Sequence, residues 1–195
     1  MNDTAEKPYC IAFGIPATRE EFIWSLSRPE SDYARRWLGG WRQYRAQVVS
    51  DLETVAPDLD RAGVELVRGL RVGQLASLFV NRRVVVLFSH WAGDKVEFFD
   101  GMAGVERIMA EIPPAYEGVL DLCVCHPIAL VERLLASRPP YLVRYMKQEA
   151  APHYWLYFYR DMFSYMGARN ADYLKAFEVI AKAHIALGRA AEDRA

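Results

Sequence analysis

The sequence lacks an excess of charge of either sign. Its 195 residues include 24 lysine and arginine residues against 25 aspartate and glutamate residues, which gives a formal net charge of −1. Because no global field attracts nucleic acid or acidic lipid, neither is expected as a partner. No apolar run approaches the ~18 residues of a membrane span, and the opening MNDTAEKPYC has no apolar h-region. The sequence therefore predicts a cytoplasmic protein without a membrane segment.

Cysteine and nucleotide-binding glycine motifs are also scarce. The three cysteines, Cys10, Cys123 and Cys125, cannot all pair, and reduced thiols are the simplest interpretation. No Gly-x-Gly-x-x-Gly or Gly-Lys-Ser/Thr pattern occurs, which argues against a nucleotide-dependent function. No cofactor is therefore expected. Since the chain has no low-complexity linker either, we predict one domain over residues 1–195.

What the sequence does contain is an alternation of strand and helix patterns. The run 84–89, VVVLFS, has no polar alternation, which is typical of a central parallel strand covered on both faces. Strands alternating with helices indicate parallel crossovers. The sequence thus predicts an α/β three-layer sandwich with a mainly parallel central sheet and helices on both faces. The predicted strands are 9–16, 63–70, 84–89, 118–125 and 141–147, with an edge hairpin at 95–102; the predicted helices lie within 19–59 and at 71–83, 104–112, 127–137, 152–166 and 171–188.

Two candidate catalytic residues stand at the ends of predicted strands. His90 follows the strand 84–89, and Cys125 ends the strand 118–125. Functional groups of parallel sheets gather at the carboxyl ends of the strands, and neighbouring strands lie only ~5 Å apart. A thiol is a strong nucleophile only as the thiolate. An imidazole within reach would raise the thiolate fraction or protonate a leaving amine. The pair therefore indicates attack on a substrate carbonyl.

Three stretches carry a resemblance to a known family. VVVLFSHW (84–91), FFDG (98–101) and GVLDLCVCHP (118–127) resemble the caspase-fold cysteine peptidases, and most closely the bacterial CHAT family. In that family one strand ends in a His-Gly pair and the next strand ends in the catalytic cysteine; here 35 residues separate His90 from Cys125. The similarity continues through an aromatic helix and an alanine-rich one, and covers roughly residues 64–187.

The resemblance implies a caspase-like sandwich and a cysteine endopeptidase activity. In this interpretation Cys125 is the nucleophile, His90 is the acid and base, and backbone N–H groups near them form the oxyanion site. The substrate is a protein or peptide, and a regulatory protein or a second copy of the chain is the further partner that the resemblance suggests.

Two positions depart from the family pattern and support a second hypothesis. Trp91 stands where the family has a glycine that lets substrate approach the backbone, and Pro127 lacks an N–H that could serve as an oxyanion donor. The alternative function is a catalytically inactive caspase-fold module that binds a protein partner. The two hypotheses differ in whether the Cys125 sulfur lies near the His90 ring in an open cleft or Trp91 fills that space.

Four further residues are candidates for substrate binding. Ser89 and Trp91 flank His90 and are expected to shape the cleft. Asp121 and Glu149 border the predicted site, and either carboxylate could recognise a basic substrate residue through a charge-assisted hydrogen bond. Local pairing of Asp121 and a helix-opening role for Glu149 remain alternatives.

The second thiol and the neighbouring histidine have other interpretations. Cys123 alternates with Cys125 along the strand, so it is expected to face a helix layer as a small apolar side chain, although it is also the alternative nucleophile. Cys123, Cys125, His126 and His90 are together the donor types that zinc prefers. Because successive strand residues point to opposite faces, these donors do not converge, and no metal is expected. His126 is then a surface or supporting residue.

Overall fold

The chain folds around a five-stranded parallel β-sheet. The computed structural model describes residues 7–125, 127–145 and 151–192. Within these residues the strand order is β2-β1-β3-β7-β8, and every neighbouring pair is parallel. The predicted α/β class is confirmed, and the run VVVLF forms the central strand with all of its side chains buried. The strands are β1 (Tyr9–Phe13), β2 (Val64–Val67), β3 (Val84–Phe88), β7 (Val119–Cys123) and β8 (Leu142–Tyr145).

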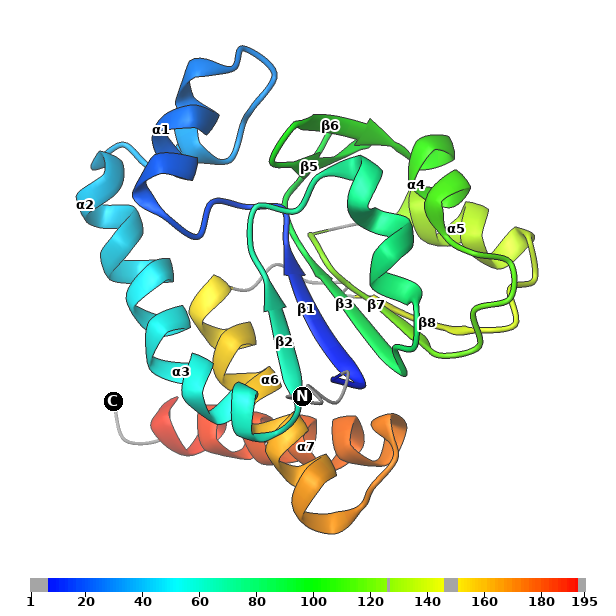
Figure 1. Ribbon diagram of the computed structural model, residues 1–195. Helices are drawn as coiled ribbons and strands as arrows, with labels where there is room; N and C mark the ends of the chain where they lie inside the picture. The colour runs from blue at the N-terminus through cyan, green and yellow to red at the C-terminus, as the bar shows by residue number, and fades with distance from the viewer. Residues whose placement is uncertain (1–6, 126, 146–150, 193–195) are drawn as a thin grey trace, which may run out of the picture.

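Helices cover both faces of the sheet, as the sequence predicts (Figure 1). The alternation of side chains along β3 divides the core, because Val84, Val86 and Phe88 pack on one face while Val85 and Leu87 pack on the other. We call these the α3/α6 face and the α4/α5 face. The first is covered by α3 (Ser50–Arg61) and α6 (Pro152–Arg169), and the second by the 3₁₀ helix η3 (Val72–Phe79), α4 (Val105–Glu111) and α5 (Ile128–Ala136).

The segment between β1 and β2 is helical with breaks where the sequence predicts them. Thr18 caps the first helix, since its hydroxyl oxygen accepts the Glu21 N–H at 3.2 Å. The chain leaves the helix before Pro29 and turns again at Gly40, whose φ is +60°. The elements are α1 (Arg19–Ser27), the 3₁₀ helix η1 (Ala34–Arg36), α2 (Gly40–Tyr44) and the π-helical turn η2 (Arg45–Val49), which continues into α3.

The predicted edge hairpin is part of a separate small sheet. Its three antiparallel strands follow β3 directly and are β4 (Trp91–Ala92), β5 (Lys95–Phe98) and β6 (Gly101–Gly104). Val96 and Phe98 are buried on the α4/α5 face, whereas Glu97 points the other way and is also fully buried. The small sheet and α1 lie at the end of the main sheet where its strands finish (Figure 1).

Several boundaries differ from the sequence predictions, and the strands predicted at 9–16 and 63–70 end at Phe13 and Val67. The segment 71–83 forms a 3₁₀ helix rather than an α-helix, and it ends at Phe79. The strand 118–125 ends at Cys123, so Cys125 lies two residues beyond it. The last helices are longer than predicted, because α6 runs to Arg169, and Asn170 then adopts a left-handed conformation with φ of +48°. Helix α7 (Tyr173–Glu192) follows and crosses the end of the sheet where the strands begin (Figure 1).

Candidate active site

The two candidate catalytic residues occupy equivalent positions on neighbouring strands. The register pairs Phe88 of β3 with Cys123 of β7, and the Ser89 N–H donates to the Cys123 carbonyl at 3.2 Å. His90 and Cys125 each follow two residues after one member of that pair. Parallel strands lie ~5 Å apart. The topology therefore brings His90 and Cys125 to the same stretch of the carboxyl edge of the sheet.

His90 is almost completely buried and is hydrogen-bonded. Its side chain is 6% exposed, and its Nε2 lies 3.1 Å from Oδ2 of Asp32. The same carboxylate oxygen accepts a hydrogen bond from Arg36 Nε at 2.8 Å. The Tyr33 ring covers the imidazole, with 5.2 Å between the ring centroids. The segment between α1 and α2 thus supplies the immediate surroundings of the candidate histidine.

Burial and pairing shift the ionisation of this histidine and its carboxylate. Burial lowers the pKa of His90 below its ordinary value of 6.5, and the hydrogen bond to Asp32 opposes that shift without cancelling it. For Asp32, partial burial acts to raise the pKa, but hydrogen bonds from Arg36 and His90 outweigh it and the pKa is lowered. At neutral pH the site therefore holds a neutral imidazole beside an ionised carboxylate.

Tyr33 connects His90 with the candidate nucleophile. The pKa of its phenol is raised, chiefly by burial and then by the Cys125 thiol, with smaller contributions from Glu97 and Cys123. The phenol is consequently within electrostatic reach of Cys125, while its ring contacts His90. One partly buried side chain thus contacts the His90 ring and lies within electrostatic reach of Cys125.

Glu97 holds the segment that carries Asp32 and Tyr33. Its Oε2 accepts the backbone N–H groups of Asp32 and Tyr33, at 3.4 and 3.0 Å. Its Oε1 accepts hydroxyl protons from Ser25, at 3.3 Å, and from Ser31. The backbone N–H of Glu97 donates to the His90 carbonyl at 2.9 Å. One fully buried residue therefore organises the Asp32 side of the site through its carboxylate and holds the His90 backbone through its own N–H.

The thiols differ in their surroundings. Cys123 is buried on the α3/α6 face, and burial together with the Asp121 carboxylate raises its pKa well above the ordinary value. Cys10 is buried on the opposite face, where burial raises its pKa to about 12. Cys125 is half-buried. Because a buried thiol of raised pKa is a poor nucleophile, Cys125 is the better candidate by its exposure.

Ser89 and Trp91, the residues predicted to shape the cleft beside His90, contact the small sheet and the α4/α5 face. The Ser89 hydroxyl donates to the Glu97 carbonyl and joins the small sheet to β3. Gly14 passes so close to this contact that a Cβ there would collide with the Glu97 carbonyl oxygen. Trp91 packs on the α4/α5 face, opposite to the face that holds Tyr33. These two residues shape the rim of the site through the small sheet.

Asp121 is placed differently from the substrate-facing position proposed for it. Its side chain is fully buried on the α3/α6 face and accepts hydrogen bonds from Arg144 Nη1 at 2.7 Å, Tyr159 at 2.8 Å and the Tyr173 hydroxyl. The local pairing that the sequence left as an alternative is the arrangement found. The carboxylate anchors α6 and α7 to β7 rather than facing a substrate. Glu149 and His126 lie outside the described residues.

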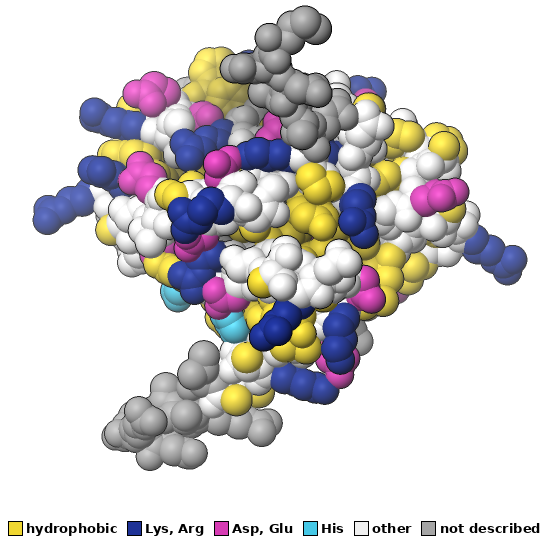
Figure 2. Space-filling view, turned by 60° about the horizontal axis from the view of Figure 1, so that its bottom comes forward, with side chains coloured by type: hydrophobic (Ala, Val, Ile, Leu, Met, Phe, Trp, Pro, Cys, Tyr) yellow, Lys and Arg dark blue, Asp and Glu magenta, His cyan; other side chains and the backbone are white. Residues whose placement is uncertain are grey.

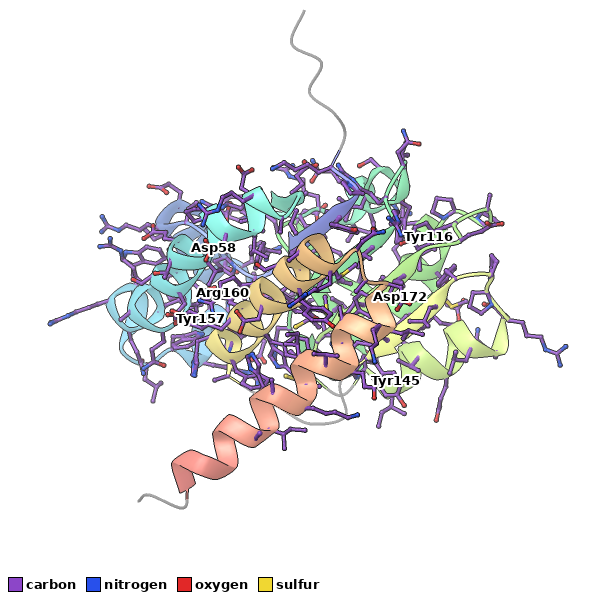
Figure 3. The ribbon with its side chains drawn as sticks, turned by 90° about the horizontal axis from the view of Figure 1, so that it is seen from below. Asp58, Tyr116, Tyr145, Tyr157, Arg160 and Asp172 are labelled. Carbon is purple, nitrogen blue, oxygen red and sulfur yellow. The ribbon has the colours of Figure 1, made fainter. Side chains whose placement is uncertain are left out.

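A cavity of about 830 Å³ lies at the other end of the sheet. Its wall includes the first residues of four strands: Tyr9, Val84, Val119 and Leu142. Figure 2 brings this end forward and shows hydrophobic side chains exposed among charged ones. Tyr116 and Asp172, labelled in Figure 3, also line it.

Two of the polar groups that line this cavity are engaged locally. The Tyr116 hydroxyl donates to the Val119 carbonyl at 2.8 Å, and Asp172 accepts the Lys175 N–H at 2.8 Å. Both side chains therefore have a structural role in the wall of this cavity. The carboxyl edge remains the candidate active site.

Sequence reasoning missed Asp32, Tyr33 and Glu97. Asp32 and Tyr33 precede His90 by nearly 60 residues in a segment without regular periodicity, so nothing in their spacing pointed to the site. Glu97 did carry a signal, because a single acidic residue inside the apolar run VEFF faces away from its neighbours on a strand.

Comparison with known proteins does not assign the chain to a family. No family model matches it, and no curated protein matches it significantly. Across the described part of the chain, no three His, Cys, Asp or Glu side chains are grouped so that they could hold a metal ion. Likewise, none of the described helices is both long and apolar enough to cross a membrane.

Proposed function

We propose that the chain is a cysteine endopeptidase in which Cys125 is the nucleophile and His90 is the acid and base. The observation that carries this proposal is the register of β3 and β7, which brings the two residues to equivalent positions on adjacent strand ends. Tyr33 supports it, because this side chain contacts the His90 ring and lies within electrostatic reach of Cys125.

The surroundings of His90 suit it to both halves of the reaction. Its lowered pKa leaves the imidazole neutral at pH 7, so it can accept the Cys125 thiol proton. The thiolate then attacks the substrate carbonyl carbon, and the imidazolium gives its proton to the leaving amine nitrogen as the C–N bond breaks. Water attacks the resulting thioester, passing a proton through the imidazole to the thiolate, and the acid product leaves.

The order of elements supports the same class of enzyme. A central strand leads to the histidine, a small antiparallel sheet and α4 follow, and the next parallel strand leads to the cysteine. That order agrees with the resemblance to the caspase-fold and CHAT peptidases. The proposed substrate is a protein or peptide, the proposed compartment is the cytoplasm, and a regulatory protein or a second copy of the chain is the proposed partner.

Alkylation of the thiols tests the nucleophile directly. We expect iodoacetamide to label Cys125 at pH 7 at least about tenfold faster than Cys123, because only Cys125 is partly exposed and His90 is the base proposed for it. Mass spectrometry of the wild-type protein and of Cys125→Ala, Cys123→Ala and His90→Ala variants measures the rates across pH. Cys10→Ala is the matched control for Cys123→Ala. Both thiols are buried, but Cys10 lies on the α4/α5 face of the sheet and Cys123 on the α3/α6 face.

Cleavage of a peptide library by the same variants completes the test. Peptidase activity that disappears in Cys125→Ala and His90→Ala but persists in Cys123→Ala supports the proposal. Slow labelling shared equally by Cys123 and Cys125, together with no cleavage, overturns it and favours an inactive module that binds a protein partner.

A further inference from the structure

We infer that Asp32 is the positioning residue of the site: it fixes His90 in the tautomer that carries its proton on Nε2 and leaves Nδ1 to exchange a proton with Cys125. This inference rests on the proposed dyad. It adds a third residue, from a segment distant in sequence, and it assigns the reacting atom of the imidazole.

The assignment of the tautomer follows from the chemistry of the contact. An ionised carboxylate only accepts hydrogen bonds. His90 Nε2 lies 3.1 Å from Asp32 Oδ2, so Nε2 is the donor and carries the proton. In a neutral imidazole the other ring nitrogen then holds the lone pair, which makes Nδ1 the basic atom. Arg36, bonded to the same carboxylate oxygen, keeps Asp32 in the accepting form.

Both partners of the contact are attached to one buried residue. Glu97 accepts the Asp32 backbone N–H through its side chain and donates its own backbone N–H to the His90 carbonyl. The relative position of Asp32 and His90 is therefore set by β5, and not only by a flexible side chain. A positioning role needs such rigidity, because a base must be held within hydrogen-bond reach of the proton that it takes.

Burial favours the neutral form of the His90 ring, and the charges around the ring act in both directions. Arg36 acts to lower the pKa of His90, whereas Glu97 and Asp32 act to raise it, and burial is the largest influence. Tyr33, on the remaining side, presents its aromatic ring and a phenol whose pKa is raised. A neutral imidazole that is oriented by a carboxylate is the state that a proton acceptor requires at pH 7.

The molecule contains a matched control for this pair. His184 Nε2 lies 3.0 Å from Oδ2 of Asp161, and Asp161 also accepts a hydrogen bond from Arg160. The two carboxylates therefore have the same kinds of partner. The second pair joins α6 to α7, where the Tyr154 and Phe158 rings adjoin the imidazole. Asp161→Asn thus changes an imidazole–carboxylate contact outside the proposed site.

Nitrogen-15 NMR of histidine-labelled protein tests the inference without relying on peptidase activity. The chain has only four histidines, so a His90→Ala variant identifies the ring signals of His90. We expect the Nε2–H tautomer for His90 in the wild type at neutral pH. We expect Asp32→Asn to convert it wholly or partly to the Nδ1–H tautomer, since an amide N–H can donate to Nε2, whereas Asp161→Asn leaves the His90 signals unchanged.

The labelling rate of Cys125 provides a second readout on the same variants. Asp32→Asn is expected to slow iodoacetamide labelling at pH 7 by roughly tenfold or more and to change its pH profile, because the base is in the wrong tautomer. An Nδ1–H wild-type ring, or a His90 spectrum that Asp32→Asn does not alter, overturns the inference. If the tautomer depends on Asp32 but labelling is indifferent to His90→Ala, the positioning role stands and the proposed peptidase function fails.

Discussion

Two imidazole–carboxylate pairs of nearly equal length lie in different parts of this molecule. His90 bonds Asp32 at 3.1 Å at the carboxyl edge of the sheet, and His184 bonds Asp161 at 3.0 Å between α6 and α7. Each carboxylate also pairs with an arginine. The His90 side chain is 6% exposed and the His184 side chain 14%. In their immediate chemistry the two pairs are almost the same.

Their wider surroundings are what distinguish them. His90 follows a central strand whose neighbour leads to Cys125, and Glu97 fixes the segment that supplies its carboxylate. His184 is surrounded by the aromatic side chains of two packed helices. A histidine bonded to an acid is therefore not in itself evidence of a site. The additional evidence is a candidate nucleophile at the same strand edge.

The largest effect on stability is expected from removing Asp121, whose carboxylate anchors the two helices that hold the His184 pair. Asp121→Ala leaves Arg144 buried without its carboxylate and frees the hydroxyls of Tyr159 and Tyr173, at a cost of about 3–5 kcal/mol in the free energy of unfolding. Urea denaturation followed by circular dichroism measures this loss.

Tyr173→Phe provides the matched milder variant for that anchor. It removes one hydroxyl from a carboxylate that keeps Arg144 and Tyr159, so a loss of about 1–3 kcal/mol is expected. If Asp121→Ala proves no more destabilising than Tyr173→Phe, the anchoring role given to this carboxylate is wrong.

The next effect concerns the His90 pair alone. Glu97→Ala leaves Arg28, whose Nη2 lies 3.9 Å from the carboxylate, together with two backbone N–H groups without their acceptor. We expect a loss of about 3 kcal/mol in stability and altered NMR signals for His90, while those of His184 are retained. Glu97→Gln is the control.

The glutamine variant is informative because it keeps most of the hydrogen bonds. Its amide oxygen can still accept the Asp32 and Tyr33 N–H groups, and its NH₂ can donate to a serine hydroxyl. It should therefore preserve the His90 signals and lose less stability than Glu97→Ala. Equal loss in both variants would show that the charge of Glu97, and not its hydrogen bonding, supports the segment.

The smallest effect is a pH dependence that belongs to His90. Because its folded pKa lies below 6.5, the unfolded state binds more protons as the pH falls through 6.5 towards the folded value. The contribution of the neutral His90 ring to the free energy of unfolding is therefore fully present above pH 6.5. It is lost as the pH falls from 6.5 to the folded pKa. The lowered pKa of Asp32 changes the stability only below pH 3.8, which is outside the pH range of the His90 effect.

Urea midpoints at pH 5 and pH 7 measure this dependence. We expect His90→Gln to lose less stability than the wild type between these pH values, since the buried neutral ring is gone. His184→Gln is the comparison variant, in which the His90 contribution remains. If His90→Gln lost as much stability as the wild type between pH 5 and pH 7, the assignment of this pH dependence to His90 would be wrong.

Periodicity alone predicted much of the fold. The run VVVLF indicated a central strand covered on both faces, and this prediction is confirmed. Helix breaks near Pro29 and at Gly40 followed from the conformations that these residues favour. The ends of elements were less predictable, and β7 stops at Cys123 although its apolar pattern continues. A strand ends where its neighbour ceases to pair, which a single segment does not encode.

The sequence by itself determined the parallel α/β sheet and associated His90 and Cys125 with the ends of two of its strands, because apolar runs and the two-residue period of a strand are local properties. Only the tertiary structure decided which strands are neighbours and what surrounds each candidate. It brought Asp32 and Tyr33 to His90, turned Trp91 to the other face and buried Asp121 beneath α6 and α7. These contacts join residues far apart in the chain, and they form because buried polar groups must find partners wherever the fold provides them.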